Sequence, residues 1–89
     1  MSNKRTYDRN YMQSLLAFNI MRQMEDKKVT VHELAIACEV TTSSIKQLIA
    51  GEQFIGARVL SNICNYLEVS PDELFKEPRD AETENTSGN

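Results

Sequence analysis

The chain has 89 residues, 40% hydrophobic and 26% charged, which is ordinary for one small globular domain. Its formal net charge of −3 argues at first sight against a nucleic-acid partner, because phosphate attracts cations. Residues 1–76, however, hold nine basic and nine acidic side chains, so the whole excess of negative charge lies in residues 77–89. The part of the chain before them is neutral and can still bind phosphate where its cations cluster.

The first ten residues are polar and basic, with Lys4, Arg5 and Arg9 against one aspartate, and we interpret them as an arm or a helix start. From Tyr11 to Asp26 apolar residues recur at helical spacing without glycine or proline, which predicts a long first helix. They form two adjoining stripes: Tyr11, Leu15 and Phe18, and then Met12, Leu16, Ile20 and Met24.

Two short helices are predicted next, each with its own start signal. Thr30 and Glu33 have the spacing of a capping box, which predicts a helix over Val31–Cys38. Thr41 is placed to cap a third helix, Thr42–Ala50, which the following glycine ends.

The last two helices complete the predicted domain. Apolar residues at 3-4-3 spacing predict a fourth helix over Gly56–Leu67, and Ser70, Pro71 and Glu73 predict a second capping box at a short fifth helix. Residues 77–89 carry four acids, one arginine and almost no apolar side chain, which predicts a disordered tail. The predicted organisation is therefore a polar basic arm or helix start (1–10), a five-helix domain (11–76) and a disordered acidic tail (77–89).

The second and third predicted helices are joined by a tight turn, and the small Ala35 lies where they cross. The outward edge of the third helix carries polar side chains that fit a major groove. This edge consists of Thr42, Ser43, Lys46 and Gln47. The arrangement is that of a helix-turn-helix, with Thr42–Ile49 as the recognition helix. A merely polar exposed face is the alternative interpretation, and the surrounding pattern favours DNA contact.

Residues 29–35, 40–51 and 60–75, the last ending in Val69-Ser-Pro-Asp-Glu-Leu-Phe, resemble the Cro and phage-repressor (XRE-type) helix-turn-helix family. Residues 19–25 are similar to the first helix of that family, so the resemblance covers 19–75. It implies an all-α fold, a compact five-helix lambda-repressor-like DNA-binding domain. It also implies a sequence-specific transcriptional regulator of the phage or mobile-element repressor type, which binds operator DNA, usually as a dimer.

The resemblance also assigns roles to single residues. Thr42, Ser43 and Gln47 match base-reading positions, and a glutamine there can bond an adenine edge in bidentate fashion. Lys46 is expected to reach a guanine or a phosphate. The expected phosphate contacts are Thr41, Gln53 in the loop Glu52–Ile55, Arg58 and Lys28, while Lys4, Arg5 and Arg9 form either a DNA arm or a solvated one.

Several positions depart from the family pattern. Val31 stands where the family commonly has a phosphate-binding glutamine, and Glu52 stands where it often has a cation. Glu39 replaces the turn glycine and is expected to take a left-handed conformation, at a cost of roughly 1 kcal/mol. The family often has a buried ion pair between its third and first helices, and Ile49 and Met24 stand at those two positions here. Replacing such an ion pair with two apolar residues can be neutral or stabilising. Val31, Glu39, Glu52 and the acidic tail favour an alternative function, a protein-binding helix-turn-helix module (antirepressor or antitoxin-like) that captures another regulator.

Other classes of function find little support in the sequence. The chain has no glycine-rich phosphate loop, no nucleophile–base set and no metal-ligand cluster, so we predict no enzyme, no cofactor and no metal site. Cys38 and Cys64 are expected to be buried core thiols in a reducing cytoplasm, and His32 a solvent-facing residue.

The expected partners are double-stranded DNA, a second copy of the chain and, in the alternative, another regulatory protein. The absence of any long apolar run argues against a membrane. A homodimer would use Tyr11, Met12 and Phe18 on the first helix, or the end of the fifth.

Overall fold

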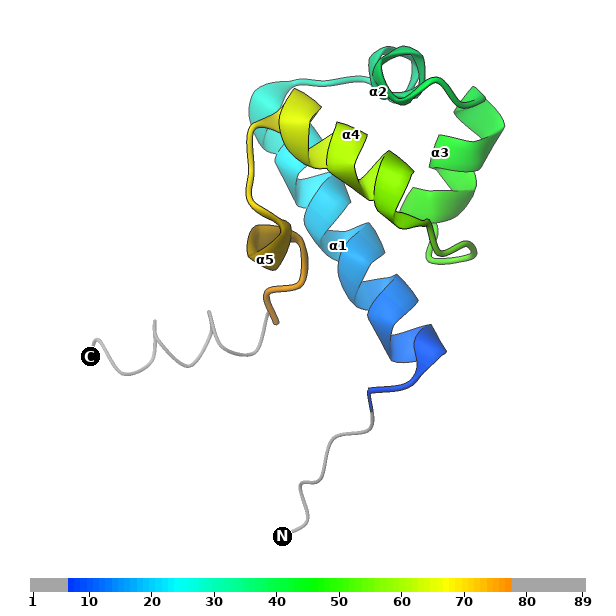
Figure 1. The fold of residues 1–89 in the computed structure, drawn as a ribbon, viewed down its shortest axis with the longest axis vertical. Helices are drawn as coiled ribbons and strands as arrows, with labels where there is room; N and C mark the ends of the chain where they lie inside the picture. Colours follow the sequence, from blue (N-terminus) through cyan, green and yellow to red (C-terminus); the bar gives the residue numbers. More distant parts are fainter. Residues whose placement is uncertain (1–6, 78–89) are drawn as a thin grey trace, which may run out of the picture.

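A computed structural model describes residues 7–77, and these residues form five α-helices and no strand. The helices are α1 (Arg9–Lys27), α2 (Val31–Cys38), α3 (Thr42–Ile49), α4 (Ala57–Leu67) and α5 (Pro71–Leu74). In Figure 1 the long α1 crosses the molecule diagonally, with α3 on one side of it and α5 on the other. The all-α, five-helix prediction is confirmed.

Helix α1 begins two residues earlier than the apolar pattern predicted. Its first turn is capped by Asp8, whose carboxylate accepts a hydrogen bond of 2.9 Å from the backbone N–H of Tyr11. Arg9 is therefore the first residue of a helix rather than part of an arm. The other two cations of the predicted arm, Lys4 and Arg5, lie outside the described residues.

The capping box predicted at α2 is confirmed. The Thr30 hydroxyl accepts from the Glu33 N–H at 3.1 Å, and the Glu33 carboxylate accepts from the Thr30 N–H at 2.9 Å. The box predicted at α5 is wrong, because Ser70 makes no side-chain cap bond. Its hydroxyl donates instead to the nearer carboxylate of Asp72, two residues along the chain, and only its carbonyl meets the Glu73 N–H.

The four longer helices all end in the same way. After each, one residue adopts a left-handed conformation, and two backbone N–H groups turn back onto the last carbonyls, as in a Schellman motif. The left-handed residues are Lys28, Glu39, Gly51 and Glu68, with φ of 56°, 59°, 77° and 60°. The left-handed Glu39 was predicted, whereas Lys28 and Glu68 were not.

Every helix contributes to one core. The fully buried side chains are Leu16, Ile20, Leu34, Cys38, Ile45, Leu48, Ile63, Leu67 and Leu74. Met24 is buried with them, and Ile49 packs against the cluster. The two apolar residues at the positions of the family's ion pair therefore both belong to the core. Among residues 7–77 no helix is long and apolar enough to cross a bilayer.

Two buried amides on α1 hold the chain segments that pack against it. The Asn19 side-chain nitrogen lies 2.9 Å from the carbonyl oxygens of both Leu74 and Lys76, which ties the end of α5 to α1. The Gln13 amide donates to the carbonyl oxygen of Gly51, just beyond α3. The Tyr11 hydroxyl donates to the carboxylate of Glu77, so this acidic residue contacts the helical domain.

Candidate nucleic-acid interface

Helix α3 has one apolar face and one polar face. Ile45 and Leu48 are about 1% exposed and anchor the helix in the core, where α2 and α1 pack against it. The four sequence-predicted base-reading side chains all lie on the opposite, exposed face: Thr42, Ser43, Lys46 and Gln47. The structure thus brings these polar side chains together on one solvent-facing surface.

The preceding helix sets the position of α3. Ala35 is 2% exposed, and its small side chain lets α2 lie close to its neighbours α3 and α4. The turn between α2 and α3 is closed by the left-handed Glu39, whose N–H bonds the Ile36 carbonyl at 3.2 Å. Because Glu39 is exposed in this turn, a carboxylate borders the start of α3.

The Thr41 side chain already makes hydrogen bonds with the first turn of α3, the helix that it caps. Its hydroxyl oxygen accepts from the Ser44 N–H at 3.0 Å, and the hydroxyl donates to the Ser44 hydroxyl at 3.2 Å. A phosphate contact through this side chain would therefore have to replace its bond to the Ser44 hydroxyl. The backbone cap can stay in place, because the Ser44 N–H needs only the oxygen.

The first turn of α4 is open to an anion. Gly56 precedes the helix and offers no side-chain cap, whereas Asp8, Thr30 and Thr41 cap the three earlier helices. Backbone N–H groups at such an end attract negative charge. Arg58 is exposed in the same turn, and the half-buried Gln53 lies in the connection that leads to it. These groups lie at and just before the first turn of α4, and they make up the candidate phosphate-binding surface.

The two cysteines are free, buried thiols, as predicted. Burial raises the pKa of Cys38, and the Arg58 guanidinium lowers it by less. The charge of Arg58 therefore acts on the end of α2, beside the turn that leads into α3. Burial also raises the pKa of Cys64. Both thiols are held in the protonated form, which is the poorer nucleophile and metal ligand.

Lys28 is not brought together with the other phosphate candidates. It follows Lys27, whose ammonium group donates to the Leu67 carbonyl at the last turn of α4. Arg58 lies in the first turn of that helix, and eleven residues span about 16 Å. Lys28 instead borders the start of α2, where His32 is also exposed.

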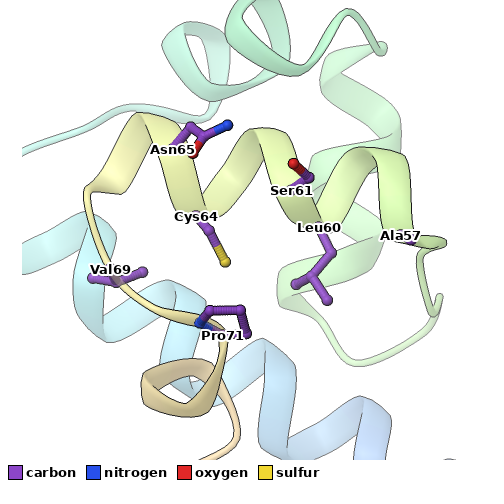
Figure 2. A pocket seen from close by; sticks show the side chains of 7 residues that line it. All are labelled: Ala57, Leu60, Ser61, Cys64, Asn65, Val69 and Pro71. Carbon is purple, nitrogen blue, oxygen red and sulfur yellow. The ribbon is translucent and has the colours of Figure 1, made fainter.

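A shallow hollow of about 330 Å³ lies on another part of the surface. It is formed by α4 and the connection to α5, with Ala57, Leu60, Ser61, Cys64, Asn65, Val69 and Pro71 as its lining. In Figure 2 the Cys64 sulfur points into it, toward Pro71. No residue of α3 lines the hollow, and its mostly apolar lining suits no phosphate. Within residues 7–77, no cluster of three or more potential ligands could hold a metal ion.

Comparison with protein families identifies the domain. The model of the Cro/C1-type helix-turn-helix DNA-binding domain matches residues 19–80. A search of curated proteins found no match. The first ten residues of α1 precede the matched range, so this half of the helix lies outside the family pattern.

Solved structures share the fold at low identity. The hypothetical transcription factor NHTF from Neisseria superposes with a TM-score of 0.74 at 17% identity, covering 93% of this chain and 95% of its own. The regulator of clp genes ClgR from Corynebacterium glutamicum gives 0.72 at 22% identity, covering 86% and 82%. The restriction-modification controller C.AhdI from Aeromonas hydrophila gives 0.67 at 16% identity, covering 71% and 96%.

Proposed function

The chain belongs to the Cro/C1-type helix-turn-helix family of DNA-binding domains, and from this premise we propose that it is a sequence-specific transcriptional regulator of the phage or mobile-element repressor type. The observation that carries the proposal is the polar edge of α3. It comprises Thr42, Ser43, Lys46 and Gln47, all exposed above a buried apolar face. Such a helix can enter a major groove while its other side stays in the core.

Base reading and phosphate binding would be divided between two elements. Gln47 would bond an adenine edge through its amide, while Lys46 reaches a guanine or a phosphate. Arg58, Gln53 and the open first turn of α4 would fix the register of the domain on the backbone. Occupancy of the operator would then act sterically, blocking or recruiting polymerase, in the cytoplasm where the DNA lies.

A homodimer is part of the proposal, because two α3 helices can then enter successive major grooves. Of the three predicted interface residues on α1, Phe18 is exposed, whereas Tyr11 and Met12 are half-buried. Phe18 is 42% exposed on α1, with the Arg22 guanidinium 5.8 Å from its ring centroid. The other predicted interface is the end of α5, and the hollow beside α4 offers a further apolar surface next to the start of that helix.

The alternative function, capture of another regulatory protein, is supported by two carboxylates. Glu39 and Glu52 are exposed at the two ends of α3, where they would repel phosphate. Val31 begins α2 without a side-chain donor for phosphate. A partner with a basic surface would suit this arrangement.

A salt titration separates the two functions. A fluorescein-labelled duplex of random sequence is titrated with the full chain, and anisotropy is followed at salt concentrations from 50 to 300 mM. DNA binding predicts that log affinity falls linearly with log salt, with a slope of about −0.9 per phosphate contact. A slope near zero, or no binding at low salt, would refute the DNA-binding proposal and leave the protein-binding alternative.

A further inference from the structure

The first half of α1 carries a buried polar side chain that the core does not need. Gln13 is 8% exposed, and its side-chain nitrogen donates to the carbonyl oxygen of Gly51 at 3.0 Å. A buried amide that loses its partner is costly, so this bond compensates for the burial of the Gln13 side chain. It joins positions 38 residues apart, one on α1 and one just beyond α3.

Gly51 is the point at which the chain leaves α3. Its φ of 77° is left-handed, and the Gly51 and Glu52 N–H groups bond the Leu48 and Gln47 carbonyls at 3.0 and 2.9 Å. A Cβ at Gly51 would stand 3.8 Å from the Cα of Ser14, so the backbone of α1 lies directly against this turn. The Gly51 carbonyl and the Glu52 N–H belong to one peptide group, which is therefore held from two sides, by Gln13 of α1 and by the Gln47 carbonyl of α3.

The connection leads directly to the candidate phosphate-binding surface. It is held at one end by the Gln13 bond to Gly51 and at the other by Ile55, which packs against the core. Between these anchors lies Gln53, and immediately after them come Gly56 and the first turn of α4. The direction in which the chain leaves Gly51 thus decides where these groups lie relative to α3.

We propose that Gln13 is a positioning residue for DNA binding: through the Gly51 carbonyl it holds the α3–α4 connection and the first turn of α4 in register with the polar edge of α3. The inference rests on the proposed function. It gives the first half of α1, which precedes the residues matched by the family model, a part in the nucleic-acid interface without any contact to DNA. Groups that are ordered before binding lose less entropy on binding.

The test compares Gln13→Met with Asn19→Leu in the full chain. Each variant removes one buried amide of α1 that bonds backbone carbonyls, but the Asn19 amide bonds Leu74 and Lys76 near α5. Binding to the random duplex is measured across salt, well below the melting temperature of each variant. We expect Gln13→Met to bind about tenfold more weakly, with a salt slope shallower by about 0.9, and Asn19→Leu to bind as the unaltered chain does.

A measurement without DNA keeps the inference testable in its own right. Amide hydrogen exchange of Glu52 is expected to accelerate in Gln13→Met relative to a core amide such as that of Ile63, and to stay unchanged in Asn19→Leu. Gln13→Glu, which puts an acceptor against the Gly51 carbonyl, should act in the same direction and serves if the methionine variant does not fold.

Three results are informative. Equal losses of affinity in Gln13→Met and Asn19→Leu would show a general effect on stability and overturn the inference, and so would unchanged binding in both. If the unaltered chain binds no duplex, the proposed function fails instead, and the exchange of Glu52 alone decides whether Gln13 orders the connection.

Discussion

Lys46 is the only charged side chain on α3, and it is exposed on the polar edge. Replacing it with alanine removes one cation without changing the core, because the buried Ile45, and not Lys46, anchors the helix. We expect Lys46→Ala to weaken binding to every duplex and to make the salt slope shallower by about 0.9, if it meets a phosphate. Fluorescence anisotropy at several salt concentrations measures both quantities.

Lys76→Ala is the matched control for that experiment. Lys76 is exposed just beyond α5, which lies on the other side of α1 from α3 in Figure 1. The control has the same charge change and should leave the affinity almost unaltered. Equal effects of the two alanine variants would mean that only net charge matters and that α3 is not the binding surface.

The sequence predicted which residues of α3 face solvent, but it did not predict the buried amides of α1. Helical periodicity separates apolar from polar residues, and it treats every polar residue as outward-facing. Asn19 follows the core residue Leu15 by one helical turn, and a polar residue at that position was the available signal. Gln13 gave no such signal, because its partner Gly51 is brought near only by the packing of α3 on α1.

At the scale of the element, the ends of the helices hold the main local strain. Glu39 has φ of 59°, a region that costs a non-glycine residue roughly 1 kcal/mol. Glu39→Gly relieves that cost and should raise the free energy of unfolding by about 1 kcal/mol, or the melting temperature by about 4–8 °C. Thermal unfolding followed by circular dichroism is the measurement.

Two variants test this explanation of the strain. Glu68→Gly, at φ of 60° after α4, should give a similar gain far from the polar edge of α3. Glu39→Gln removes the charge while keeping the side chain in the left-handed conformation, and should not raise the melting temperature. A gain in Glu39→Gln equal to that of the glycine variant would assign the effect to charge.

The elements were predictable where a short-range signal marks their ends. The Thr30–Glu33 capping box and the Thr41 cap define α2 and α3, and both helices begin where the sequence placed them. The box at Ser70 failed because a carboxylate two residues away competes for the hydroxyl. The left-handed residues after α1 and α4 are Lys28 and Glu68. Neither is a glycine, the residue that favours this conformation, so the sequence did not predict them.

At the scale of the molecule, the surfaces that would join two copies lie outside the predicted core. Sedimentation velocity of the free chain is expected to show a dimer at micromolar concentration. Two single variants locate the interface: Phe18→Ser on α1 and Ser61→Arg beside the hollow on α4. Because both side chains are exposed, neither change should lower the melting temperature much.

The variant that dissociates the dimer identifies the surface in use, and the other then serves as its control. A chain that sediments as a monomer at all concentrations, and binds DNA with a single-copy stoichiometry, would contradict the homodimer. The apolar periodicity predicted Phe18 as a candidate for this role, whereas the hollow depends on the path of the chain from α4 to α5 and so required the structure.

The central claim, that the exposed edge of α3 reads base sequence, is tested most directly by selection from a pool of random duplexes. The unaltered chain, Gln47→Ala and the control Gln23→Ala, a half-buried amide of the same type near the end of α1, are carried through the same selection. We expect the unaltered chain and Gln23→Ala to enrich one sequence, and Gln47→Ala to lose the preference for adenine at a single position of it. Enrichment of the same sequence by all three proteins, or of none by the unaltered chain, would contradict the assignment.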